Sequence, residues 1–192
     1  MPEDCASCIL LVDDDPSIRT LLSMHLEQEG FKAIAAKDGI DALVKLRDTL
    51  PKVIISDLQM PRMSGFEFIG VVRRRYPTIP VIALSGSMPN AFPEEIKPDR
   101  WVEKSIRLFP DLVQAVDELV RETPEPVYLP QVIRIPVRTR PAFAGYFILA
   151  CTDCLRTFRA TSTPENKAAE QTAVCGHCQA RVPFVVESSE PQ

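Results

Sequence analysis

The sequence has no long apolar run and no excess of charge of one sign. None of its hydrophobic stretches approaches the roughly 20 residues that a membrane-spanning helix needs, and no basic stretch precedes an apolar one at the N-terminus. The 22 basic and 26 acidic residues give a formal net charge of −4, which is typical of an ordinary soluble protein. We therefore expect a cytoplasmic protein without a membrane partner.

A helix-turn-helix output pattern, a catalytic output domain and internal repeats are also absent from the sequence. Its 192 residues, 45% of them hydrophobic, are enough for one full domain with a small appendage. Five prolines between positions 124 and 141 predict a stiff linker or edge-strand segments. The predicted organisation is a domain over residues 1–122, a proline-rich linker or edge strands over 123–144, and a small module over 145–187.

Residues 1–122 alternate short apolar runs with helical patterns. The runs predict parallel strands covered on both faces, and they lie at 9–12, 32–36, 53–57, 81–84 and 101–102. Helices are predicted over 16–30, 39–50 and 65–76 and from Pro110 onward, whereas three prolines in 86–100 allow only a short or distorted helix. This alternation implies a parallel sheet with helices on both faces, and ligands bind beyond the carboxyl ends of such strands.

Polar side chains follow the predicted strands at that edge. Asp13 and Asp14 follow the first strand, Asp57 ends the third, and Ser85 and Lys104 follow the fourth and fifth. Three crowded carboxylates repel one another, and Mg²⁺ relieves that repulsion while keeping waters for a phosphoryl group. A lysine and a hydroxyl can neutralise the remaining phosphoryl oxygens, and a carboxylate can attack phosphorus. The alternative is that these groups only solvate a sheet edge, although nothing structural requires them to converge.

Four stretches, taken in order and spacing, resemble the receiver domain of bacterial two-component response regulators. They are residues Ile9–Asp15, Ile55–Gly65, Val81–Gly86 and Glu103–Lys104, and the resemblance covers about residues 7–122. It implies a flavodoxin-like fold, in which a five-stranded doubly wound parallel sheet has the order 2-1-3-4-5. It also implies a phosphoacceptor that assists its own phosphorylation and dephosphorylation, with a histidine kinase as the donor, rather than an enzyme.

The resemblance assigns the acceptor and metal positions. It implies that Asp57 attacks the phosphoryl group and becomes an aspartyl phosphate. Asp14 and Asp57 would bind Mg²⁺ directly, Gln59 would contribute its backbone carbonyl, and Asp13 would act largely through water.

Other positions correspond to the switch of such domains. The resemblance implies that Lys104 pairs with the phosphate, that Ser85 moves toward it, and that Trp101 is the switch aromatic residue. Pro61 and Gly65 would shape the turn after the acceptor. The chain departs from the family at position 105, where Ser105 follows Lys104 in place of the usual proline. A cis peptide bond there would cost about 3 kcal/mol before serine.

The six cysteines form three C-x-x-C pairs, which in a cytosolic chain favour metal or redox chemistry over disulfides. Two pairs enclose 20 residues in the pattern of a zinc ribbon, and they are Cys151/Cys154 and Cys175/Cys178. We expect these four thiolates to close a structural Zn²⁺ site between β-hairpin arms at 146–149 and 182–186, with the metal supplying folding energy. Two unrelated reduced pairs are the alternative.

The remaining cysteine pair and the histidine beside Cys178 are not predicted to bind the metal. Cys8 begins the first strand and is predicted to be a buried small apolar residue, so a metal or redox role for the Cys5/Cys8 pair is not favoured. His177 lies inside a cysteine pair and is predicted to be a bystander.

The partner of the module is the open question in the sequence. Residues 124–192 contain seven basic and six acidic residues, and a zinc ion held by four thiolates adds two negative charges. Nucleic-acid binding usually requires a basic excess, so the leading hypothesis is a downstream protein partner or docking of the module on its own receiver. Five arginines between 134 and 159 keep a nucleic-acid-binding transcriptional regulator as the second hypothesis.

Overall fold

The computed structural model describes residues 3–86, 96–123, 137–139, 141–143, 146–161 and 171–186. Its N-terminal part has five parallel strands alternating with helices. The strands are β1 (Glu3–Val12), β2 (Lys32–Ala36), β3 (Thr49–Asp57), β4 (Val81–Ser85) and β5 (Arg100–Glu103). The helices described in this part are α1 (Pro16–Gln28), α2 (Gly39–Lys45), α3 (Gly65–Arg75) and α4 (Leu108–Glu122).

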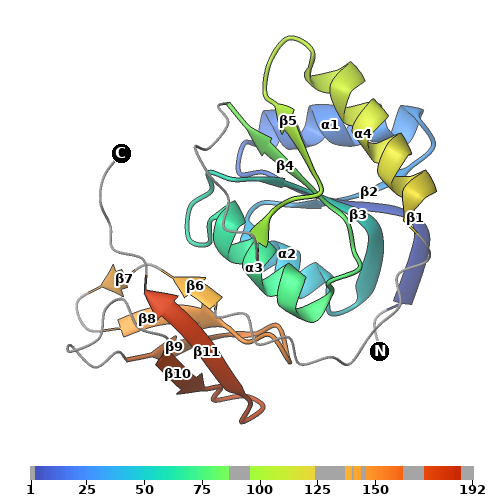
Figure 1. Cartoon of the computed structure of the whole chain (residues 1–192). Coiled ribbons are helices and arrows are strands. Elements are labelled where there is room, and N and C mark those ends of the chain that lie inside the picture. The colour runs from blue at the N-terminus through green and yellow to red at the C-terminus, as the bar shows by residue number, and fades with distance from the viewer. Residues whose placement is uncertain are drawn as a thin grey trace.

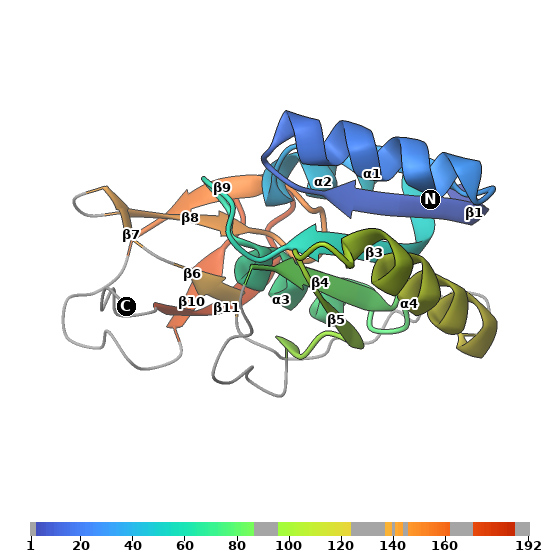
Figure 2. The same ribbon diagram turned by 90° about the horizontal axis from the view of Figure 1, so that it is seen from above.

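The sheet order is β2-β1-β3-β4-β5, which confirms the predicted order. Figure 1 and Figure 2 show α1 and α4 on one face of this sheet and α2 and α3 on the other. Each face has its own buried cluster: Leu22 and Leu26 of α1 share one cluster with Val116 of α4, whereas Leu43 of α2 and Phe68 of α3 belong to the other. The doubly wound α/β architecture therefore follows from the fully apolar strands, which must be covered twice.

Three predicted boundaries are wrong, each for a local reason. β1 starts at Glu3 rather than Ile9, and its first residues pair with the start of β3, Cys5 opposite Pro51. The helix predicted over 39–50 ends at Lys45, because the residue before Pro51 disfavours helical geometry and this stretch joins β3. The last helix begins at Leu108, not Pro110, since a proline in the first turn of a helix loses no hydrogen bond. The weak fourth helix predicted within 86–100 falls mainly at 87–95, outside the described residues.

The C-terminal part is a small β structure. In the described residues it has two three-stranded sheets of order β10-β11-β6 and β7-β8-β9. Their strands are β6 (Val137–Thr139), β7 (Pro141–Phe143), β8 (Tyr146–Ala150), β9 (Thr157–Ala160), β10 (Gln171–Val174) and β11 (Arg181–Val186). The predicted hairpin arms correspond to β8 and β11, each paired with an antiparallel partner, β9 and β10.

The C-terminal strands lie beside α2 and α3 (Figure 1). Phe147, Leu149 and Phe184 belong to the same continuous cluster of buried residues as α3 side chains. The α1–α4 face lies on the opposite side of the sheet. In the described part of the chain, no helix is long and apolar enough to cross a bilayer.

Candidate functional site

An acidic pocket lies at the carboxyl ends of β1 and β3. Asp13 is fully buried, Asp57 is 5% exposed and Asp14 is exposed. Each of the three residues has one carboxylate oxygen in a common group, and these three oxygens all lie within 4.8 Å of one another. The topology thus brings together the three acids expected from the sequence, because parallel strands deliver their carboxyl ends to one edge.

Lys104 joins the pocket from the end of β5. Its Nζ atom donates to Asp13 Oδ2 at 2.8 Å and to Asp57 Oδ2 at 2.7 Å. Burial alone would lower the pKa of Lys104, but the hydrogen bonds to these two carboxylates outweigh it and raise that pKa. Lys104 is therefore held as a cation between the two buried acids.

Asp13 is the electrostatically costly member of the pocket. Burial raises the pKa of its carboxyl, although hydrogen bonds from Lys104 and from the Asp15 backbone N–H act in the opposite direction. Oxygen-only donors with more negative than positive charge fit a hard divalent cation such as Mg²⁺, which would take over part of the lost hydration.

The substitution of proline by Ser105 does not remove Lys104 from the pocket. No cis peptide bond occurs in the described ranges, so the Lys104–Ser105 bond is trans. The N–H of Ser105 donates to the carbonyl of Glu103 at 2.8 Å, and the N–H of Leu108 donates to Ser105 at 3.1 Å. This tight turn brings the chain into α4 while Lys104 keeps its contacts with both acids.

Ser85 and Trp101 lie on the neighbouring strands β4 and β5. Ser85 is buried at the end of β4, and its carbonyl accepts the Lys104 N–H at 2.9 Å. Trp101 on β5 pairs in register with Ala83, two residues before Ser85. Among the described residues, the indole Nε1 of Trp101 is buried and has no hydrogen-bond partner. Both residues predicted to form the switch therefore lie on β4 and β5, the two strands that follow β3 in the sheet order.

The loop after Asp57 folds back on that residue. The N–H of Gln59 donates to Asp57 Oδ1 at 3.1 Å, and the N–H of Gly65 donates to Leu58 at 3.0 Å. A Cβ atom on Gly65 would lie 2.0 Å from the backbone oxygen of Asp57, so this position admits only glycine. Pro61 begins the turn, and the predicted role of Gly65 in shaping it has a direct steric reason.

Sequence reasoning missed a second contact that fixes this loop. Arg62, which has a left-handed φ of 67°, forms an ion pair with Asp38, whose side chain is 1% exposed. Asp38 also caps α2 by accepting the N–H of Asp41 at 2.9 Å. An aspartate before glycine at the start of a helical pattern is a recognisable cap, but its arginine partner depends on tertiary structure.

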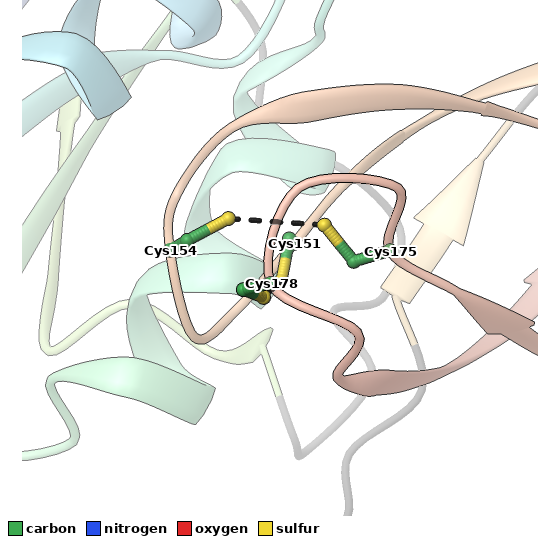
Figure 3. Close-up of side chains that lie close together, drawn as sticks. All are labelled: Cys151, Cys154, Cys175 and Cys178. Atoms are coloured by element: carbon green, nitrogen blue, oxygen red, sulfur yellow. Dashed lines mark hydrogen bonds between the residues drawn. The ribbon is translucent and has the colours of Figure 1, made fainter.

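The second candidate site consists of four cysteines at the tips of two hairpins (Figure 3). Cys151 and Cys154 lie between β8 and β9, and Cys175 and Cys178 lie between β10 and β11. The four sulfur atoms all lie within 4.8 Å of one another. The Cys151–Cys178 sulfurs are 3.6 Å apart and the Cys154–Cys175 sulfurs 3.8 Å apart.

These separations suit a tetrahedral metal. Zn–S bonds of about 2.3 Å place the sulfurs of a tetrahedral four-thiolate site about 3.8 Å apart. The two turns also share one hydrogen-bond pattern, which we call a knuckle. In each, the first cysteine donates its N–H to the residue five positions later and accepts from the residue four positions later. The residues four positions after the first cysteine are Leu155 and Gln179. Their φ values are left-handed, at 53° and 64° respectively.

The thiols differ in how readily they ionise. Burial raises the pKa of Cys151 and of Cys154. Burial acts in the same direction on Cys175, but the N–H groups of His177 and Cys178 and the nearby thiols outweigh it and lower its pKa to about 7. The His177 ring lies against the carbonyl of Thr157 at 3.2 Å, as expected for a bystander to the sulfurs.

Cys8, at the other end of the chain, is not a member of this cluster. Cys8 is fully buried in β1, which confirms its predicted burial. Its sulfur is in a disulfide, so the expectation of reduced cysteines throughout the chain is wrong at this position. The side chain of Cys5 lies outside the described residues.

Comparisons with known proteins agree with the geometry of the acidic pocket. Residues 9–97 match the family model of the response regulator receiver domain. Residues 9–97 are therefore a receiver domain of the kind found in two-component response regulators.

Among curated proteins, an uncharacterised 14.6 kDa protein of Leptolyngbya boryana is 48% identical over 79 residues, which are 40% of this chain and 60% of that protein. The transcriptional regulatory protein GlrR of Escherichia coli is 38% identical over 85 residues, 43% of this chain. The match spans only 19% of GlrR. The chain thus covers less than two thirds of these relatives.

Solved structures show the same fold. Response regulator TrrA of Thermotoga maritima, crystallised in complex with Mg²⁺ and BeF, is 32% identical with a TM-score of 0.55. The match covers 59% of this chain and 98% of TrrA. Chemotaxis protein CheY4 of Vibrio cholerae is 31% identical with the same TM-score and the same coverage. TrrA has also been crystallised with the histidine kinase ThkA.

Proposed function

We propose that this chain is a two-component response regulator that accepts a phosphoryl group on Asp57 from a histidine kinase. The observation that carries the proposal is the convergence of Asp13, Asp14, Asp57 and Lys104 at one sheet edge. A metal site alone would not need a lysine that bonds two of its carboxylates. A phosphoryl-transfer site needs both a metal ion and a lysine, because negative charge must be neutralised on the transferred group.

The transfer uses the carboxylate of Asp57 as nucleophile. One of its oxygens forms a bond to phosphorus while the phosphorus–nitrogen bond of a phosphohistidine breaks, and the electron pair stays on the imidazole nitrogen. Lys104 then exchanges its bond to Asp57 for one to a phosphoryl oxygen, and the Ser85 hydroxyl donates to another. Bound Mg²⁺, held by Asp14, Asp57 and the Gln59 carbonyl with Asp13 acting through water, supplies neutralising charge.

The switch follows from the position of the moving groups. A phosphoryl group on Asp57 draws the hydroxyl of Ser85, on β4, and the adjacent Trp101 side chain repacks on β5. Its unpaired indole N–H gives it no hydrogen bond to break. Phosphorylation therefore shifts the population of two arrangements of the β4–β5 face, which a downstream protein partner reads.

An apolar surface beside the pocket suits the phosphodonor. Leu21 and Met24 on α1 are 53% and 54% exposed, and Ile106 is fully exposed. Helix α1 begins directly after Asp15 and Ile106 follows Lys104 by two residues, so both segments start at the pocket. A kinase helix that covers these side chains would bring its histidine to the acceptor. The crystallised complex of TrrA with a histidine kinase supports a protein donor for this kind of domain.

We further propose that the four cysteines hold one structural Zn²⁺. All four ligand positions are filled by sulfur, so the metal has no open position and joins the two hairpins rather than catalysing a reaction. Among the described module residues, Arg159 stacks on Tyr146 at 5.0 Å, which uses one arginine for packing. Residues 124–192 also lack a basic excess, with seven basic and six acidic residues, which favours a protein partner over nucleic acid for the output.

The acceptor is tested by labelling the full chain with acetyl phosphate and Mg²⁺ and measuring the intact mass. The wild type gains one phosphoryl group, and Asp57→Asn gains none. The matched control is Asp48→Asn, which changes an exposed aspartate outside the pocket and keeps full labelling. Equal labelling of the Asp57→Asn variant would refute the assignment.

A further inference from the structure

The two cysteine knuckles have the same backbone hydrogen bonds but different surroundings. In the first knuckle, Thr152 is 2% exposed and Leu155 is 3% exposed. The matching positions of the second knuckle are Gly176 and Gln179, and both are exposed. A turn that only presents two thiolates has no reason to bury its outer residues. The first knuckle must therefore be covered by another part of the chain.

The cover is the receiver domain. Arg47, directly after α2, donates from Nη2 to the carbonyl of Leu155 at 2.9 Å, across 108 positions of sequence. Cys151 and Leu155 belong to the same buried cluster as Leu43 and Leu46 of the α2 segment. Figure 1 shows the C-terminal strands against the α2–α3 side of the sheet. The first knuckle thus packs on the C-terminal end of α2.

The carbonyl of Leu155 is in place to accept the Arg47 hydrogen bond only while the knuckle is closed. Leu155 is a non-glycine residue in the left-handed region, with a φ of 53°. Its N–H donates to the carbonyl of Cys151 at 2.8 Å, which fixes its own carbonyl toward Arg47. A leucine leaves this conformation when nothing holds it. Gathering the thiolates around a metal is what holds such a turn in a small module.

The other end of α2 contacts the loop after the phosphoacceptor. Asp38, the cap of α2, pairs with Arg62, and a Cβ on Gly39 would lie 2.6 Å from Met63. Both partners lie in the loop between Asp57 and α3. Helix α2 is only seven residues long, so its two ends are two turns apart. One short helix therefore touches the cysteine site at one end and the acceptor loop at the other.

We propose that the first knuckle is a built-in brace for α2, so that metal binding at the four cysteines orders the α2–α3 face of the receiver domain. The inference rests on the metal centre of the proposed function and adds a role for it. The occupant of this face is the chain's own module, and the α1–α4 face, the β4–β5 face and the exposed second knuckle are left to outside partners. Arg47 is the positioning residue of the brace.

Hydrogen–deuterium exchange on the full chain, with zinc bound and after chelation, tests the brace. The amides of Leu46, Arg47 and Asp48 bond to carbonyls of α2 and its last turn, and they report on this end of the helix. Removing zinc lowers their protection about tenfold, the loss expected when one charge-assisted hydrogen bond and its packing are released. Amides in α4, on the opposite face, keep their protection and show that the receiver domain remains folded.

Variants separate the brace from a general effect of zinc. Arg47→Ala and the milder Arg47→Gln bind zinc normally, yet their α2 amides exchange equally fast with and without the metal. Lys45→Ala removes a positive charge from the same helix end, where Lys45 pairs with Asp41 of its own helix, and keeps the zinc effect. Zinc binding without any change at α2 in the wild type would overturn the brace alone. A chain that binds no zinc would overturn the metal centre, and the brace with it.

Discussion

At the scale of single residues, Asp13 shows how the pocket trades stability for function. Its carboxyl is fully buried beside two other acids, and burial is the largest cause of its raised pKa. An acid whose pKa is higher in the folded chain binds more protons there than when unfolded. Stability without metal therefore falls as the pH rises from 3.8 through the folded-state pKa.

Replacing Asp13 by asparagine should remove this cost. The amide oxygen can still accept from Lys104, so we expect Asp13→Asn to be more stable than the wild type at pH 7 without Mg²⁺. Adding Mg²⁺ should raise the melting temperature of the wild type more than that of the variant, which keeps the direct ligands Asp14 and Asp57 but loses the charge of Asp13. Thermal unfolding across pH measures both effects. A variant less stable than the wild type at pH 7 would show that the charged form of Asp13 is stabilising.

Trp101 provides a second test at this scale, because it is the single tryptophan of the chain. Mg²⁺ with fluoroberyllate, a mimic of the phosphoryl group, should change the intrinsic fluorescence as Trp101 repacks beside Ser85. Asp57→Ala should lose the response to fluoroberyllate. A wild-type spectrum indifferent to both ions would mean that Trp101 is not coupled to the acceptor.

At the scale of elements, the strand ends were predictable and the contacts between distant elements were not. Asp13, Asp57 and Lys104 could be placed together because parallel topology sends every strand end to one edge. The pairing of Arg62 with Asp38 and of Arg47 with Leu155 depends on which helix faces which loop, which local pattern does not encode. The early end of α2 was missed for a similar reason. The stretch before Pro51 becomes a strand because β1 extends to pair with it.

The loop between β3 and α3 gives the sharpest element-scale prediction. Gly65→Ala places a Cβ against the backbone oxygen of Asp57, and backbone cannot rotate away as a side chain can. We expect a loss of stability of about 3 kcal/mol, at the upper end of overpacking effects, and loss of Mg²⁺ binding. Gly86→Ala is the matched control, since its Cβ would have no atom within 4 Å. Equal stability of the two variants in denaturant unfolding would contradict the tight turn.

At the scale of the whole molecule, the cysteine pattern predicted a cluster but not its docking. The spacing of the pairs was enough to expect four convergent sulfurs, and the structure brings one sulfur of each within 4.8 Å of the rest. Nothing in the spacing distinguished docking on the receiver from an outside partner. The arginine that covers Leu155 lies in the other part of the chain, so only the folded structure reveals the contact.

Metal content tests the cysteine module directly. The purified protein should contain about one Zn²⁺ per chain, and Cys175→Ser should lose it, because the remaining three thiolates cannot close the tetrahedron. Chelation should unfold the module after about residue 145 and, through the brace, loosen α2. Cys5→Ser should leave the zinc content unchanged. Elemental analysis measures the metal, and a value near zero in protein prepared without chelator would exclude the zinc site.

The central claim, that Asp57 carries the phosphoryl group, has one direct test that needs no mutation. The full chain is phosphorylated with acetyl phosphate and Mg²⁺, reduced with borohydride and digested for peptide mass mapping. Borohydride converts an aspartyl phosphate to homoserine and thereby marks the acceptor permanently. The structure predicts homoserine at position 57 and at no other aspartate. Homoserine at Asp13 or Asp14, or none in a chain shown by intact mass to be phosphorylated, would contradict it.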